Sequence, residues 1–567
     1  ESPLTPNVLW AGTDDGNVQL TRDGGKTWTN VAGKVPGVPK GTYVSRVVAS
    51  RSAEGAAFIT FDGHRSDDYS IYIFATADYG ETWKPIRAGI PDSAGSVHVV
   101  REHPRNSNLL FAGTEFGLWI SWDRGANWTA FKNNFPTVPV DDIELQATYN
   151  DLVLATHGRS IWIFDDLTPI EKMDSSVASG DFTFFPPRST NVWFITNRRW
   201  SAGQKMFVAK NPLPGAILNY YLKSALPPEE PKKESDQEKE AEKSEKAAAT
   251  QAAQVAPKKD EPVPQQKETG AAEKAKQPIQ AADKEEKPEA EKKEGQVKIT
   301  VTDKDGKVIR ELNGPAAAGV NRASWDLRYN SPAEPSPEQL EAMAAGYDFG
   351  PRGPFVEPGE YTIKIKAGDK EATQKVTVEA DPRLPLNAED RVARRAAIDQ
   401  LYAMAKSTDK DRKTILGIQS ALTSARESWK KEADKKDGLK IPAEIVKSAD
   451  DLQKKVNDVA LKYRREQQGL GNAGPPFEWR PDPLPSQVQD LMQDLDEFAA
   501  APGGQQKEKL AELTPLVADA SAQVKKISDE DLPALNKRMN EAGIPHIVPT
   551  PPSSSGRRGG SDEDDDL

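Results

Sequence analysis

The sequence of 567 residues contains no cysteine. Disulfides, thiolate metal sites and cysteine nucleophiles are therefore excluded, and the fold has to be stabilised by packing. Long apolar runs are also missing, because segments such as 71–75 and 109–112 are far shorter than the ~20 residues that a membrane helix needs. We therefore expect no membrane span.

Basic residues are outnumbered by acidic residues. Lys and Arg number 75 against 87 Asp and Glu, the net charge is -12, and no basic stripe occurs that could neutralise phosphates. Nucleic acid is therefore not an expected partner. Residues 1–10 hold no initiator Met, basic n-region or apolar h-region, so they show no signal peptide, and we expect the true start to lie upstream.

One pattern, [ST]-x-D-x-G-x-[TN]-W, occurs three times: TRDGGKTW, TADYGETW and SWDRGANW, at 21–28, 76–83 and 121–128. The spacing of roughly 45 to 55 residues is near the length of one four-stranded propeller blade. Short runs of alternating apolar and polar residues on both sides of each motif indicate strands A to D of one blade, with the motif in the C–D turn. The pattern therefore predicts consecutive blades of a β-propeller.

The parts of the motif have structural roles. An Asp carboxylate can accept N–H bonds across a tight turn, Gly supplies a positive φ, and Trp fills the space between neighbouring sheets. We therefore assign three residues of each motif to structure, and replacing any of the tryptophans by Ala should cost ~3–5 kcal/mol. They are Asp23, Gly25, Trp28, Asp78, Gly80, Trp83, Asp123, Gly125 and Trp128.

The composition and periodicity divide the chain into a mainly β part and a helical part. Residues 1–170 read as about four blades, the first without its A strand, so we expect upstream blades. Residues 181–380 read as an Ig-like β-sandwich with a disordered Lys/Glu/Ala/Pro-rich insertion at 227–294. Apolar stripes at 3-4 spacing predict an antiparallel helical region over 386–545, with a first helix from Ala388 to Lys406 capped by Asn387. An acidic tail at 550–567 should be disordered.

The three motifs and the phrases AGTDDGNVQLTRDGG, AGTEFGLWISWDRGANW and ATHGRSIWIFDD resemble BNR, or Asp-box, repeat proteins. Within these, the chain is most similar to the C-terminal portion of bacterial sortilin/VPS10-like proteins, which are often named glycosyl hydrolases. The resemblance implies binding of peptide or protein. The same repeat also occurs in sialidases and xyloglucanases, so the resemblance is compatible with glycosidase activity as well. It also implies a secreted or periplasmic location.

Strands in a blade run alternately up and down, so the B–C turns lie on the face opposite the Asp boxes, and ligand sites gather on such loop-rich faces. We expect a ligand-binding surface of mixed charge there. Its candidate residues are Asp14, Asp15, His64, Arg65, Asp67, Asp68, Glu115, Phe116, His157 and Arg159. The structural alternative is the commoner one: the H-R-S-D-D turn as a solvated loop, and Arg159 paired with a carboxylate of a neighbouring blade.

Nothing in the sequence identifies a catalytic residue, a metal site or a cofactor. A P-loop, an H-E-x-x-H helix, a G-x-S-x-G elbow and an EF-hand are all absent, and Asp303 to Gly306 reads as a hairpin turn. The favoured hypothesis is a non-enzymatic extracytoplasmic recognition or scaffold protein that binds peptide, protein or glycan. The alternative is a glycoside hydrolase with paired carboxylates at the propeller centre, partly on missing blades. A third reading is a structural assembly component.

Overall fold

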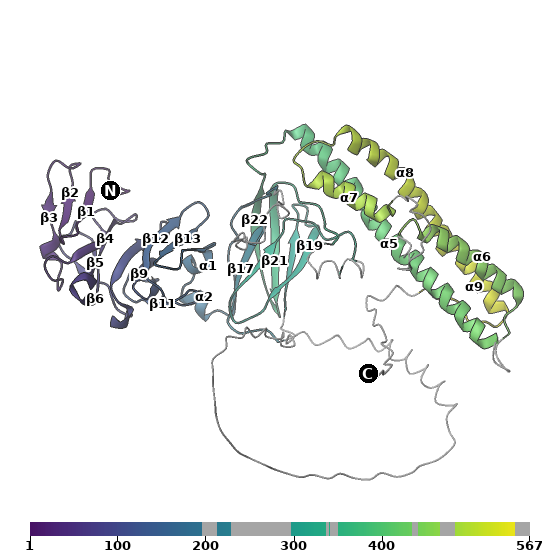
Figure 1. The fold of residues 1–567 in the computed structure, drawn as a ribbon, viewed down its shortest axis with the longest axis horizontal. Coiled ribbons are helices and arrows are strands. Elements are labelled where there is room, and N and C mark those ends of the chain that lie inside the picture. The colour runs from purple at the N-terminus through teal and green to yellow at the C-terminus, as the bar shows by residue number, and fades with distance from the viewer. Residues whose placement is uncertain are drawn as a thin grey trace, which may run out of the picture.

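The structure, a computed structural model, describes residues 1–194, 213–227, 296–335, 340, 350–433, 440–464 and 482–549. Figure 1 shows small sheets at the N-terminal end, then two larger sheets, then a long antiparallel group of helices. The chain is thus mainly β and then helical. Most of the predicted insertion at 227–294 and the predicted tail at 550–567 lie outside the described residues.

Four antiparallel sheets follow one another between residues 9 and 164, and we call them the four-sheet arc. In each sheet, strands adjacent in sequence pair in order, as in a meander. The first strands of the second, third and fourth sheets, β4, β8 and β12, lie side by side, which is a propeller-like arrangement. The first sheet has β1 (Leu9–Gly12), β2 (Val18–Thr21) and β3 (Thr29–Asn30); the second has β4 (Tyr43–Ala49), β5 (Ala57–Gly63), β6 (Asp68–Thr76) and β7 (Lys84–Pro85); the third has β8 (Val97–Glu102), β9 (Leu110–Thr114), β10 (Gly117–Ser121) and β11 (Thr129–Phe131); the fourth has β12 (Val140–Gln146), β13 (Asp151–Thr156) and β14 (Ile161–Phe164).

The three recurring motifs form the same hydrogen-bonded turn. The carboxylates of Asp23, Asp78 and Asp123 each accept the backbone N–H of the residue four positions on, at 2.8–2.9 Å. The hydroxyl of the first motif residue accepts the N–H of Gly25, Gly80 or Gly125, and these glycines have φ of 93°, 76° and 88°. The aspartates are therefore occupied in bracing turns.

The motif tryptophans differ in burial. Trp83 and Trp128 are 6% and 4% exposed, and Trp83 packs edge-on against Trp10 of the first sheet with ring centroids 6.1 Å apart. Trp28 is 44% exposed, contrary to the expectation that all three fill spaces between sheets. The reason is that Trp83 and Trp128 each have a preceding sheet in the described chain to pack against, whereas the first sheet has none on that side.

Two larger sheets, which follow the arc in the chain, pack face to face. Their buried side chains, including Trp325 and Tyr220, form one common core, as in a β-sandwich. The Ig-like topology stays a prediction. One sheet has the order β15 (Phe182–Phe184), β17 (Ala216–Leu222), β20 (Gly319–Trp325), and the other β16 (Thr190–Asn191), β22 (Lys370–Glu379), β21 (Gly359–Ala367), β18 (Gln296–Thr302), β19 (Val308–Pro315).

The predicted hairpin turn at Asp303 joins β18 and β19, where its carboxylate accepts the N–H of Lys307 at 3.0 Å. Short helices α1 (Thr168–Glu171) and α2 (Ser175–Ser179) connect the arc to the sandwich. The buried carboxylate of Asp166 accepts a hydrogen bond from Asn219 of β17 at 2.7 Å, which ties the end of the arc to the sandwich.

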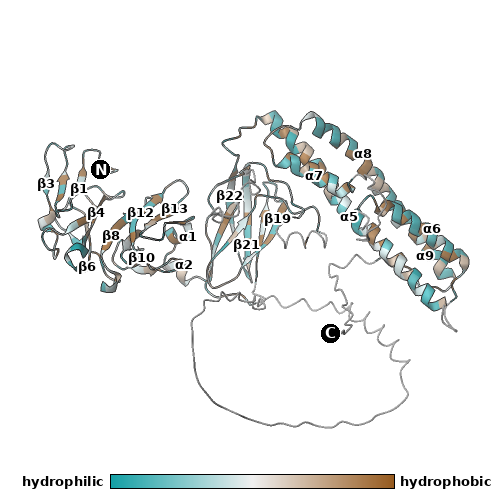
Figure 2. Ribbon diagram, viewed as in Figure 1, coloured by the Kyte–Doolittle hydropathy of each residue, from teal (hydrophilic) through white to brown (hydrophobic). Residues whose placement is uncertain are grey.

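The C-terminal helices share one apolar core. Figure 2 shows apolar and polar positions alternating along them, as amphipathic helices require. None of the described helices is long and apolar enough to span a membrane. They are α5 (Ala388–Ala433), α6 (Ala443–Ala460), α7 (Leu484–Asp496), α8 (Gly504–Lys526) and α9 (Leu532–Glu541), with a π-helical turn at Ile527–Asp531 between the last two.

The predicted end of the first helix at Lys406 is wrong, because α5 runs unbroken from Ala388 to Ala433, 46 residues in all. The polar stretch after Lys406 has no Pro or Gly to break the helix, and Asp409 there pairs with Arg412 and Lys413 on the same helix. The predicted cap at Asn387 is present, since its side-chain oxygen accepts the N–H of Asp390 at 2.9 Å.

A buried ion-pair network joins the helices to the sandwich. Asp496, at the end of α7 and 2% exposed, accepts hydrogen bonds from Arg328 at 2.6 Å and from the backbone N–H of Phe355 at 3.0 Å. Arg394 of α5 donates to the backbone carbonyls of Leu495 and Asp496 at 3.1 and 2.9 Å. Because these groups are withdrawn from water and satisfied, they fix the helices against the sandwich.

Candidate functional site

The first strand of each complete or nearly complete sheet carries a β-bulge at the same place. The ladder register shifts by one residue between Val44 and Arg46 in β4, and the same shift recurs in β8 and β12. A bulge leaves one residue outside the ladder and re-aims its side chain. The three bulge residues are Ser45, His98 and Asp141.

A second set of equivalent positions lies where the next strand ends. Phe61, Thr114 and Thr156 pair with the residue just before the bulge, so the residues after them occupy equivalent places in three sheets. These are Asp62, Glu115 and His157, and the phrase A-G-T-D places Asp14 at the corresponding point of the first sheet. Bulge and turn positions therefore bring ionisable side chains together on the loop face, the face formed by the turns after β1, β5, β9 and β13.

His98 links two of these carboxylates across a sheet boundary. Its Nε2 lies 2.9 Å from Glu115 of its own sheet, and its Nδ1 lies 3.5 Å from Asp62 of the preceding sheet. The same Asp62 oxygen lies 2.7 Å from Nδ1 of His64, whose backbone N–H donates to the other oxygen at 3.0 Å. We call Asp62, His64, His98 and Glu115 the His98 cluster.

Within the His98 cluster, burial shifts each pKa in one direction and the neighbouring charges and hydrogen bonds shift it in the other. Burial by itself lowers the pKa of His98, but the hydrogen bonds and charges of Asp62 and Glu115 outweigh it and raise the pKa. Burial also raises the pKa of Asp62, yet the hydrogen bonds from His98 and from the His64 backbone hold that pKa well below its usual range. The cluster thus favours an ion pair between Asp62 and a protonated His98.

The His98 cluster has a buried part and an accessible part. The Asp62 side chain is 4% exposed, whereas the side chains of His64 and Glu115 are 43% and 32% exposed. Phe116, directly after Glu115, is 54% exposed. A ligand could therefore reach His64, which the buried carboxylate holds, Glu115, which His98 holds, and the ring of Phe116 beside it.

General acid chemistry requires a carboxyl whose pKa is raised. Among the described carboxyls of the arc, those with a displaced pKa are all displaced downward. Hydrogen bonds are the reason, as for Asp78, where the Thr82 hydroxyl and backbone N–H lower the pKa to about 2. These six aspartates are therefore held in their charged form.

Other predicted site residues belong to, or hydrogen-bond within, the turns in which they lie. Asp15 accepts from Asn17 at 2.8 Å, and Asp68 accepts the Tyr72 hydroxyl at 2.8 Å. Asp67 adopts a left-handed φ of 60° at the end of the turn that contains Arg65.

The rest lie on the surface. The Arg65 guanidinium lies 5.0 Å from the centroid of the Tyr43 ring. His157 is 3.4 Å from Asp141, but its side chain is 81% exposed. Asp14 and Arg159 are exposed.

Of the predicted residues, the structure therefore joins His64 and Glu115 in one hydrogen-bonded cluster. Asp62 and His98 were missed, because Asp62 directly follows the predicted strand Ala57 to Phe61 and His98 lies within the predicted strand Val97 to Arg101. Aligning ITFD at 59–62 with AGTE at 112–115 would have placed Asp62 opposite Glu115. Among the described residues, no group of three or more His, Asp and Glu side chains could hold a metal ion.

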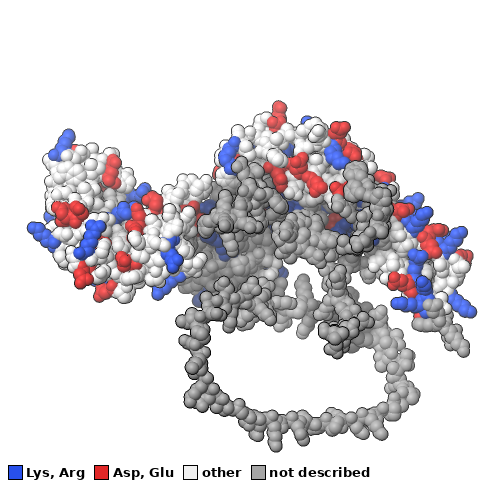
Figure 3. Space-filling model, in the orientation of Figure 1, with Lys and Arg blue, Asp and Glu red and all other residues white. Residues whose placement is uncertain are grey.

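Acidic and basic side chains intermix on the face of the described residues that Figure 3 shows.

No protein-family model matches the chain, and no curated protein matches it. Solved structures match parts of it. An ancestral GH74 enzyme is 12% identical over 39% of this chain and 30% of its own, with a TM-score of 0.25. A GH74 xyloglucanase from Xanthomonas campestris is 13% identical over 39% of this chain and 36% of its own, with a TM-score of 0.24.

PorZ, a surface component of the type-IX secretion system of Porphyromonas gingivalis, is 11% identical over 66% of this chain and 37% of its own, with a TM-score of 0.24. The chain thus spans about a third of the length of each of these three proteins. At such scores, function has to be inferred from the side-chain contacts of the chain itself.

Proposed function

We propose that this chain is a non-enzymatic recognition protein that binds a peptide or protein segment on the loop face of the four-sheet arc, at the His98 cluster. The observation that carries the proposal is the imidazole of His98 placed between Asp62 of one sheet and Glu115 of the next. Because the bond to His98 already orients the partly exposed Glu115 carboxylate, little side-chain entropy would be lost when a ligand binds to it.

The ligand chemistry follows from what is exposed. Glu115 offers an acceptor for a backbone N–H or a basic side chain, and Phe116 offers an apolar ring beside it. A peptide with a basic and an apolar side chain close together fits both. The sandwich and helices would then act as a rigid spacer in an extracytoplasmic scaffold.

Binding of the full chain to peptides selected from a random library tests the proposal. Glu115→Gln should weaken binding about tenfold or more, because a hydrogen bond to a charged group contributes about 1.5–3 kcal/mol. His157→Gln is the matched control, since His157 holds the equivalent place in the next sheet but is largely exposed. Equal losses in both variants, or no selectable peptide, would count against the proposal.

A glycoside hydrolase is the rival, and the same pair of carboxylates on neighbouring sheets is what favours it. Its test is a panel of aryl glycosides and polysaccharides. Sugar release that is abolished by Asp62→Asn or Glu115→Gln would replace recognition with hydrolysis.

A further inference from the structure

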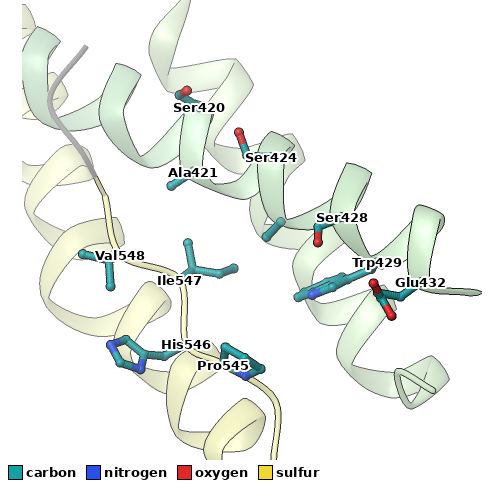
Figure 4. Close-up of a pocket in the computed structure, with 11 residues that line it drawn as sticks. Ser420, Ala421, Ser424, Ser428, Trp429, Glu432, Pro545, His546, Ile547 and Val548 are labelled. Carbon is teal, nitrogen blue, oxygen red and sulfur yellow. The ribbon is translucent and has the colours of Figure 1, made fainter. Parts of the chain in front are cut away.

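A groove of about 540 Å³ lies far from the arc, between the C-terminal half of α5 and the extended segment Pro545–Val548 that follows α9. Figure 4 shows the ring of Trp429 lying between the helix and this segment, with Ser420, Ser424 and Ser428 on successive turns of α5. The volume is within the ~300–1,000 Å³ typical of small-molecule sites.

Both walls of the groove are held in place. The backbone N–H and C=O of Ile547 bond to the side-chain amide of Asn536 on α9 at 2.7 and 2.9 Å, and the Ile547 side chain is buried. On the other side, α5 is tied to α6 by Gln419, which donates to Asn457 at 2.7 Å. The groove is therefore formed before any ligand arrives.

The serine hydroxyls in the groove are available. Hydroxyls on helices commonly bond back to the carbonyl four residues earlier, as Thr423 and Ser448 do here at 2.9 and 2.8 Å. Ser420, Ser424 and Ser428 have no such bond, nor any other side-chain hydrogen bond to the described residues. Each can therefore donate to and accept from a ligand.

The lining excludes some ligand classes. None of its eleven residues is Lys or Arg and one is Glu432, so apart from His546 an anionic ligand would meet no basic side chain within the groove. An indole ring beside a row of hydroxyls suits a molecule with one apolar face and a polar rim, which describes a pyranose ring. Residues four apart on a helix are separated by about 6 Å along its axis, close to the advance of one residue in a β-linked glycan.

From these observations we infer that the groove is a binding site for a neutral β-linked oligosaccharide, with one sugar face stacked on Trp429 and successive hydroxyls bonded to the serines. This site is separate from the His98 cluster and does not depend on the function proposed for it.

Titration of the full chain with a neutral β-1,4-linked glucose hexamer, followed by calorimetry, tests the inference. Trp429→Ala should weaken binding about tenfold or more, Trp429→Phe should retain part of it, and Ser424→Arg should block it by filling the floor. Ala511→Arg, an exposed position of α8 outside the groove, is the control for an added arginine. Circular dichroism establishes that each variant is folded.

The outcomes separate the two proposals. Glucan binding that survives Glu115→Gln and fails in Ser424→Arg supports the groove site, whatever the peptide assay gives. No binding by the parent chain, binding unchanged in both Trp429→Ala and Ser424→Arg, or equal affinity for a galacturonate oligomer, which is acidic, would overturn it.

Discussion

The three motif tryptophans allow a quantitative test of packing between sheets. A buried aromatic side chain covers about 150–250 Å², which at ~25 cal/mol per Å² corresponds to ~4–6 kcal/mol, near the ~3–5 kcal/mol measured for Trp→Ala in cores. Trp83→Ala and Trp128→Ala should fall in this range, because both side chains are almost fully buried. Trp28 is 44% exposed, so Trp28→Ala should cost only about half as much, ~2 kcal/mol.

The indole N–H groups sharpen this prediction. Trp128 donates to the carbonyl of Ile86 at 2.6 Å, whereas the buried Nε1 of Trp83 has no hydrogen-bond partner among the described residues. Trp→Phe removes the N–H and keeps most of the apolar contact. Trp128→Phe should therefore cost ~1–3 kcal/mol more than Trp83→Phe, since it leaves a carbonyl without its donor while the other change removes an unsatisfied group.

Hydrogen exchange read by mass spectrometry is the appropriate assay. The chain holds 12 Trp, so total fluorescence would average over the arc, the sandwich and the helices. Exchange of peptides from β2, β5 and β9 instead reports the opening free energy of the first three sheets. A loss for Trp28→Ala equal to that for Trp83→Ala, or a larger cost for Trp83→Phe than for Trp128→Phe, would refute the reasoning.

Three further predictions concern other parts of the chain. Because the pKa of His98 is raised in the folded protein, its stabilising contribution is complete below the unfolded value of about 6.5 and is lost as the pH rises through the raised value. Exchange protection of β8, corrected for the intrinsic exchange rate, should therefore fall between about pH 6 and about pH 9. The same fall in a His98→Gln variant would contradict this. Asp496→Asn should destabilise the helices by ~3–5 kcal/mol in thermal melts followed at 222 nm, because Arg328 loses its buried counter-charge; an unchanged melting curve would show that the network is dispensable. Asn387→Ala should cost ~1 kcal/mol and raise amide exchange at Asp390, which loses its acceptor, while a distant amide in α6 should not change.

Much of the fold was readable from local chemistry. The Asp-x-Gly-x-x-Trp spacing encodes a turn whose bonds close within eight residues, and alternation located the strands on either side. The same locality explains the Asn387 cap and the Asp303 hairpin, because in both the donor and the acceptor are at most four residues apart. Where local signals were weak, as after Lys406, the predicted helix end was wrong.

The candidate site was only partly readable. His64 and Glu115 were predicted as turn residues, but nothing in the sequence said that they would share a cluster with Asp62 and His98. That depends on a bulge in β8, which shifts the register by one residue and is not encoded by any single residue type.

By itself, then, the sequence determined the elements that close over a few residues: turns, caps, strand alternation and helical stripes. It also determined the lack of thiol chemistry. The tertiary structure alone decided which tryptophan is buried, which carboxylate lies beside an imidazole, and which serines line a groove. Those outcomes depend on residues tens to more than a hundred positions apart, such as the contacting pair Asp62 and His98 or Trp429 and Ile547 on two walls of one groove. They come together only once the sheets and helices have packed.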